Sequence, residues 1–194
     1  QKAVSVLFPK HAETQYEVLQ VHEAPEFSIG ELCTALERLK PKKSAGPDGI
    51  SSINLRYLVQ AAPENVLRIM NDCLAKGIFP DKWKRAKLLL LHKEGKPKDD
   101  PAAYRPICLL DSIGKLLEQL IAIRLNQECQ EKEILNERQF GFRYGRSTID
   151  ALSMVTNQLE HAKTSKGFAA LVTVDIRNAF NSASWQNILR VLKE

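Results

Sequence analysis

The chain has 194 residues, 44% of them hydrophobic and 26% charged, with a formal net charge of +5. This length is enough for one good-sized core, and the composition is ordinary for a globular protein. No apolar run approaches the roughly 18 residues of a membrane span, and no signal-peptide pattern precedes the first elements. We therefore expect an intracellular protein without membrane spans. Because the chain begins at Gln1 and ends within a helical pattern, we also expect a segment of a longer protein.

A helix is the first element that the sequence predicts. Residues 1–27 show little periodicity and are expected to form a partly ordered lead-in. Ser28 and Glu31 then have the spacing of a capping box, and Pro41 ends the helix that they begin. The apolar face of this helix comprises Ile29, Leu32, Leu36 and Leu39.

Two further helices are expected after a loop. Residues 46–49 read Gly-Pro-Asp-Gly and predict turns. Ser51 or Ser52 can cap the second helix. Pro63 opens the third helix, and Gly77 suits its C-terminal cap.

The middle of the chain predicts a β-hairpin. Residues 86–92 and 104–110 have strand character, and the segment between them is rich in turn formers and charge. Residues 82–105 contain eight basic residues and only three acids. This excess of positive charge suits a polyanionic partner such as nucleic acid, although a solvated lysine-rich loop is equally compatible. The basic residues are Lys82, Lys84, Arg85, Lys87, Lys93, Lys96, Lys98 and Arg105, and the acids are Glu94, Asp99 and Asp100.

Helices and a glycine-rich loop follow the hairpin. Asp111 or Ser112 can cap a helix, and residues 139–146 form a loop of aromatic, glycine and arginine residues. Ser147 and Asp150 repeat the capping-box spacing at the start of the next helix. The apolar residues of the first helix are Leu116, Leu117, Leu120, Ile121 and Leu125, and those of the second are Ile149, Leu152, Val155 and Leu159.

An apolar β-branched run ends in a single carboxylate near the C-terminus. Residues 171–174 predict a buried strand that delivers Asp175 to the rim of a sheet, and Ser184 can cap a last helix. Such an acid suits a metal site, but an isolated Asp at a strand end also serves as a cap or turn acceptor. A strand-end phosphohydrolase requires a second Asp two positions later, where this chain has Arg177.

The cysteines and histidines do not have the spacing of a zinc module. We expect buried, reduced thiols instead. The residues concerned are Cys33, Cys73, Cys108 and Cys129, with His11, His22, His92 and His161.

Five ordered blocks together resemble the first half of a reverse transcriptase, nearest to those of non-LTR retrotransposons of the insect R-type and jockey-like groups. The resemblance covers roughly residues 40–194. The blocks are Gly46–Gly49, Lys93, Tyr104–Leu110 with Lys115, Gln139–Arg143 with Arg146–Ala151, and Val174–Asn181.

The resemblance implies an α+β fold, comprising the fingers and the first strand and helix of the palm of a right-hand polymerase. Residues 1–40 would then be a lead-in with one helix, residues 41–167 the fingers, and residues 168–194 the start of the palm. The implied activity is that of an RNA-directed DNA polymerase, which adds deoxynucleotides by two-metal phosphoryl transfer.

The resemblance also assigns roles around the predicted strand end. Asp175 is the implied catalytic residue and ligand of two Mg²⁺ or Mn²⁺ ions, and the carbonyl of Ile176 is a further metal ligand beside the nucleotide. Phe180 would lie beneath the sugar and reject a 2′-hydroxyl, while a core aromatic is the alternative for this side chain. Family members often have Asp where this chain has Asn181.

Basic residues receive roles by the same resemblance. Lys93 and Arg105 would bind the incoming deoxynucleoside triphosphate, and Lys96 and Lys98 would be solvated or touch the template backbone.

The loop of residues 139–146 would lie along the template. Gly141 would allow close approach to nucleic acid, and Arg143 and Arg146 would contact it. Core packing and nucleic-acid contact remain equal alternatives for Phe140 and Phe142.

The implied partners are an RNA template, a DNA primer or target, and deoxynucleoside triphosphates, and the nucleus is the implied location. The Tyr/Phe-x-Asp-Asp turn that supplies the other carboxylates in this family does not occur in the 194 residues. We therefore expect the chain alone to be inactive. The alternative is a non-catalytic nucleic-acid-binding remnant or a host-adopted relic of a retrotransposon.

Overall fold

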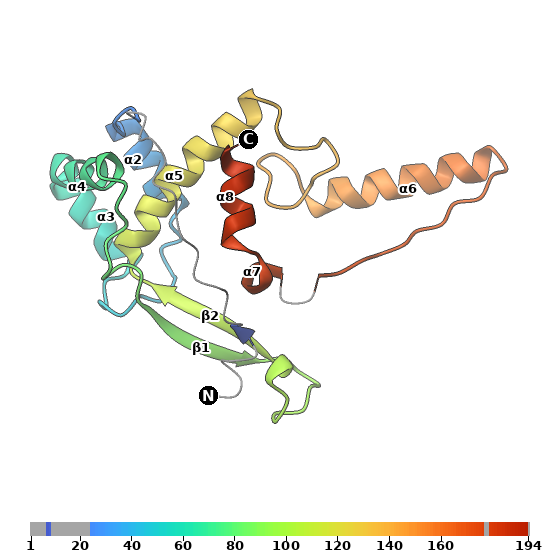
Figure 1. Cartoon of the computed structure of the whole chain (residues 1–194), viewed down its shortest axis with the longest axis horizontal. Helices are drawn as coiled ribbons and strands as arrows, with labels where there is room; N and C mark the ends of the chain where they lie inside the picture. The colour runs from blue at the N-terminus through green and yellow to red at the C-terminus, as the bar shows by residue number, and fades with distance from the viewer. Residues whose placement is uncertain (1–6, 9–23, 177–178, 194) are drawn as a thin grey trace. The chain divides into compact units, whose positions relative to one another are not determined.

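A computed structural model describes residues 7–8, 24–176 and 179–193, and it confirms the mixed α+β class (Figure 1). The predicted lead-in lies mostly outside these residues. The chain divides into two units, residues 1–120 with 176–194 and residues 121–175. The elements in chain order are α2 (Ile29–Arg38), α3 (Ser52–Ala61), α4 (Pro63–Ala75), β1 (Ala86–His92), the 3₁₀ turn η1 (Pro101–Ala103), β2 (Tyr104–Leu110), α5 (Ser112–Glu131), α6 (Thr148–Thr164), α7 (Ala179–Ser182) and α8 (Trp185–Lys193).

The predicted helix boundaries of the first unit are confirmed. Ser28 and Glu31 form the capping box of α2, and the Ser51 hydroxyl accepts the N–H of Asn54 at the start of α3. Gly77, which follows α4, donates its N–H to the Leu74 carbonyl. Its φ of +60° lies in the left-handed region, which residues other than glycine rarely adopt. Local chemistry alone therefore sets these boundaries.

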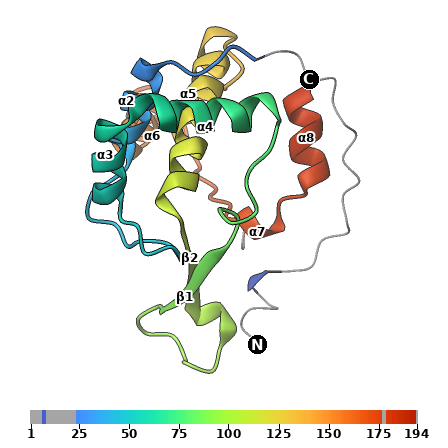
Figure 2. The same ribbon diagram turned by 90° about the vertical axis from the view of Figure 1, so that its left-hand side faces the viewer.

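The core of the first unit lies among α2, α3, α4 and the first turns of α5. Figures 1 and 2 both show these helices side by side. The largest fully buried side chains include Leu32 of α2, Leu55 of α3, Met70 of α4, and Leu116 and Leu120 of α5. Burying a side chain of this kind contributes roughly 1.5–3 kcal/mol, so this cluster is a main source of stability.

The predicted hairpin is confirmed. Strands β1 and β2 pair antiparallel from Ala86 opposite Leu110 to His92 opposite Tyr104. In both views the hairpin extends away from α2, α3 and α4 (Figures 1 and 2). Every residue of β1 is exposed, so the strands are held mainly by their ladder and by side chains at the two ends of the hairpin.

The second unit contains the last turns of α5 and all of α6. The predicted capping box of Ser147 and Asp150 is confirmed at the start of α6. No described residue of α6 is buried, and Ile149 and Leu152 on its apolar face are 71% and 67% exposed. The sequence pattern thus predicts the helix correctly, but the apolar face of α6 stays largely exposed in the described residues.

The predicted buried strand before Asp175 is wrong for this structure. Residues 167–176 form no strand, and Val172 and Val174 are 82% and 87% exposed. A strand needs a hydrogen-bonded neighbour, and the described part of the chain has only the sheet of β1 and β2. An apolar β-branched run therefore favours strand conformation, but it forms a strand only when another strand pairs with it.

The prediction of buried thiols is also wrong. All four cysteines are free, but Cys33 and Cys108 are exposed, and Cys73 and Cys129 are half-buried. Cys108 lies on β2, none of whose residues is buried. Within the described ranges, no helix combines the length and the apolar character that a membrane crossing requires.

Candidate functional site

Lys93 and Arg105 lie on the same face of the hairpin. Arg105 is opposite Leu91, and the N–H of Lys93 continues the ladder to the Ala103 carbonyl at 2.7 Å. Side chains alternate between faces along a strand, so Leu91, Lys93, Ala103 and Arg105 share one face. The register brings two predicted triphosphate ligands together at the far end of the hairpin.

The Lys93 ammonium group already makes one hydrogen bond within the hairpin. Its Nζ donates to the Ala102 carbonyl at 2.8 Å, and the side chain is half-buried. An ammonium group has three donors, so two remain for phosphate oxygens while the first holds the amine in place. Arg105 is exposed and offers a planar fork of donors beside it.

The opposite face of the hairpin carries an aromatic pair that sequence reasoning missed. His92 and Tyr104 face each other across the ladder, with ring centroids 5.3 Å apart in an edge-to-face arrangement. The Tyr104 hydroxyl donates to the Lys98 carbonyl at 2.8 Å, and His92 Nε2 lies 2.9 Å from the Lys96 carbonyl oxygen. Both rings therefore hold the backbone of the basic tip. The only sequence signal was an aromatic residue at each strand end beside the turn.

The loop of residues 46–49 is fastened to the junction of β2 and α5. The buried Asp111 carboxylate accepts the N–H of Asp48 at 3.1 Å, and the Ser112 hydroxyl donates to the Ile50 carbonyl at 2.9 Å. Sequence analysis predicted Asp111 and Ser112 only as caps. They also fix the Gly-Pro-Asp-Gly loop to the base of the hairpin.

The loop of residues 139–146 exposes several groups that suit nucleic acid. Arg143 donates from Nη1 to the Asn136 carbonyl at 2.8 Å, and the Arg146 guanidinium lies 5.7 Å from the centroid of the Phe140 ring. Phe142 has φ +57° and is 88% exposed, so its ring is not buried among the described residues, while Phe140 is half-buried. A side chain at Gly141 would meet nothing within 4 Å, which leaves its backbone open to a partner.

The residues predicted to bind metal, Asp175 and Ile176, do not form a metal site within the described part of the chain. Asp175 and Ile176 are exposed, and Phe180 is 79% exposed in α7. Among residues 7–8, 24–176 and 179–193, no three His, Cys, Asp or Glu side chains lie close enough together to bind a metal ion. Mg²⁺ demands an octahedral set of oxygen ligands, so one carboxylate and one carbonyl do not fit a two-ion site by themselves.

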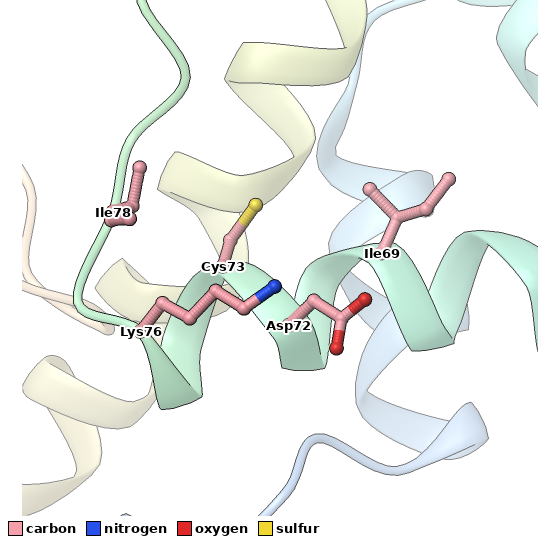
Figure 3. A pocket seen from close by; sticks show the side chains of 5 residues that line it. All are labelled: Ile69, Asp72, Cys73, Lys76 and Ile78. Carbon is pink, nitrogen blue, oxygen red and sulfur yellow. The ribbon is translucent and has the colours of Figure 1, made fainter.

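A pocket of about 150 Å³ lies between α4 and the segment that follows it (Figure 3), and its lining residues are Ile69, Asp72, Cys73, Lys76 and Ile78. Its volume is below the range of roughly 300–1,000 Å³ that ligand sites occupy. Partial burial and the neighbouring Asp72 carboxylate raise the pKa of the Cys73 thiol, although Lys76 opposes them. The thiol is thus not activated as a nucleophile, and we assign no chemistry to this pocket.

The structure brings the predicted site residues together in two groups. Lys93, Lys96, Lys98 and Arg105 share the hairpin, and residues 141–146 share one loop. The hairpin belongs to the first unit and the loop to the second, and the boundary between the units also separates Asp175 from Ile176.

Comparisons with known proteins identify the family. The family model described as "Reverse transcriptase (RNA-dependent DNA polymerase)" matches residues 93–194. The chain is 37% identical to a probable RNA-directed DNA polymerase from transposon BS of Drosophila melanogaster, over 86% of the chain and 18% of that protein. It is 36% identical to a Pol polyprotein of the type-1 retrotransposable element R1 of Bradysia coprophila, over 88% of the chain and 17% of that protein.

A third relative agrees with this. The RNA-directed DNA polymerase from mobile element jockey of Drosophila melanogaster is 34% identical over 79% of the chain and 17% of its own length. The chain thus spans less than a fifth of the length of these relatives. The family model covers β2, the loop of residues 139–146 and Asp175. Together with the relatives, it shows that the chain belongs to the reverse transcriptase family, in the branch of the non-LTR retrotransposons.

Proposed function

We propose that the chain forms the fingers and the start of the palm of an RNA-directed DNA polymerase that copies element RNA from a DNA primer. The observation that supports this most directly is the hairpin register, which puts Lys93 and Arg105 on one face. Two cations on one face of the hairpin suit the oxygens of a triphosphate, whose charge they would offset before and during transfer.

The remaining roles are proposals from family membership together with exposure. Asp175 would contribute one carboxylate to a divalent-metal site whose further ligands come from elsewhere in the polymerase. Bound ions of this kind stabilise the attacking and leaving oxygens of a phosphoryl transfer. Phe180 would contact the sugar of the nucleotide. Gly141, Arg143 and Arg146 would follow the template, in keeping with their open loop.

Primer extension tests the proposed function. The intact polymerase that contains this segment should extend a DNA primer on an RNA template only when deoxynucleoside triphosphates are present. The 194-residue chain alone should not, because it supplies one carboxylate of the proposed site. An intact protein that binds primer–template but incorporates no nucleotide would instead be a nucleic-acid-binding relic. A polymerase that copies element RNA at a DNA target would act in the nucleus, which is the location that we propose.

A further inference from the structure

We infer that Tyr104, with His92 beside it, is a positioning residue that holds the basic tip of the hairpin in the conformation that binds the template backbone. The basic tip is the segment of residues 93–100, which carries Lys96 and Lys98. The inference rests on the proposed function and deepens it, because it concerns how the same hairpin meets nucleic acid.

The two faces of the hairpin carry different groups. Lys93 and Arg105 share one face, whereas His92 and Tyr104 share the other. The aromatic pair therefore lies on the face away from the proposed triphosphate ligands. Any effect of Tyr104 on substrate must then pass through the tip whose backbone it binds.

The two rings bind backbone atoms of the basic tip. Tyr104 Oη donates to the carbonyl of Lys98, and His92 Nε2 lies within hydrogen-bond distance of the carbonyl of Lys96. A carbonyl oxygen only accepts, so the contact is a hydrogen bond in the His92 tautomer that carries a proton on Nε2. Each ring thus fixes the main chain of one tip lysine and leaves the ammonium group exposed to a partner.

Apart from these two contacts, the tip has short-range turn bonds, from the Lys96 N–H to the Lys93 carbonyl and from the Asp100 N–H to the Pro97 carbonyl. Within the described residues, the tip is exposed at every position except the half-buried Lys93, and its further ties are short-range. Gly95 has φ +73°, and Asp100 Oδ1 accepts the N–H of Ala102. A lysine on a flexible loop must be ordered when it binds phosphate, so fixing its backbone beforehand reduces the cost of binding.

A double-mutant cycle on the intact polymerase tests this inference through the dissociation constant for primer–template. Tyr104→Phe removes one hydroxyl and keeps the ring, and it should weaken binding roughly two- to tenfold, the range expected for one hydrogen bond. Lys96→Ala/Lys98→Ala should weaken binding and lower the salt slope by about two, one unit for each phosphate contact. Added to the lysine variant, Tyr104→Phe should change binding little, because its effect passes through these lysines.

Two further variants provide a second test of the tip and a control. His92→Phe preserves the ring contact but loses the hydrogen bond to Lys96, so it should weaken binding in the same direction. Tyr57→Phe makes the same chemical change at a tyrosine that is 66% exposed on α3, and it should bind as the wild type does.

Three results would overturn the inference: wild-type binding by Tyr104→Phe, an undiminished Tyr104→Phe effect without the two lysines, or wild-type binding by the lysine variant. Absence of primer extension by the unsubstituted polymerase would refute the proposed function instead, and the binding cycle would still decide the role of Tyr104.

Discussion

Gly46 lies against the backbone of Asp111 so closely that a Cβ atom on Gly46 would come within 2.4 Å of the Asp111 amide nitrogen. The loop before α3 thus touches the start of α5 backbone to backbone, 65 positions further along the chain. Neither main chain can yield as the end of a flexible side chain could. Only glycine fits at this position without moving one of them.

Gly46→Ala should therefore destabilise the chain. Forcing a methyl group into a filled space costs about 1–3 kcal/mol of unfolding free energy, and the loss should appear as a lower midpoint in urea unfolding. Gly30→Ala is the matched control. The nearest atom to a Cβ there is 3.8 Å away, and alanine favours the helix, so the midpoint should stay or rise. An unchanged midpoint for Gly46→Ala would show that the two segments are not in contact.

Substitutions of Lys93 and Arg105 should act on nucleotide binding in different ways. Arg105→Lys keeps the charge but loses the fork of donors, so the KM for deoxynucleoside triphosphates should rise severalfold. Lys93→Ala should raise KM and also loosen the tip, because its Nζ binds the Ala102 carbonyl. Steady-state kinetics of the intact polymerase measure both effects. Lys87→Ala, an exposed lysine of β1 nearer the base of the hairpin, is the control and should leave KM unchanged.

Replacing Phe180 by valine should weaken the discrimination between deoxy- and ribonucleotides. A smaller side chain leaves room beneath the sugar for a 2′-hydroxyl, and contacts of this size change selectivity by about 10- to 200-fold. The readout is the ratio of kcat/KM for the two nucleotide types. Phe180→Tyr keeps the ring and should retain the selectivity. Equal ratios for the valine variant and the wild type would assign Phe180 to packing.

The capping box of α6 should make the free energy of unfolding depend on pH in the acid range. The side chain and the N–H of Ser147 both donate to Asp150, and they lower the pKa of its carboxyl below the ordinary 3.8. A pKa that is lower in the folded state stabilises the fold above the unfolded pKa. This contribution is lost as the pH falls through the folded pKa. Thermal unfolding between about pH 5 and pH 2 should show a steeper loss for the wild type than for Asp150→Asn. Parallel curves would contradict the assigned hydrogen bonds.

The sequence predicted best those features that depend on neighbouring residues. The capping boxes at Ser28 and Ser147, the turn at Gly77 and the hairpin all follow from local chemistry, and all are confirmed. The contact of Gly46 with Asp111 and the hydrogen bond from Asp48 to Asp111 join residues more than 60 positions apart, and no local pattern reveals such pairs.

The segment before Asp175 is one that the sequence predicted wrongly. Its β-branched residues predict a strand, but a strand exists only when another one supplies hydrogen bonds, and no described segment does so. For the candidate site, the identities of Lys93 and Arg105 came from the family resemblance. Their shared face came from the register, and the support that Tyr104 gives to the tip came from the structure alone.

The central claim is that Asp175 is a catalytic carboxylate of a polymerase, and primer extension by Asp175→Asn in the intact protein tests it most directly. This change keeps the size of the side chain and removes its charge, so the rate should fall at least about a hundredfold while primer–template binding persists. Asp72→Asn, the same change at an exposed residue of α4, should extend the primer at the wild-type rate. Extension by Asp175→Asn at a rate within a fewfold of the wild type would contradict the account.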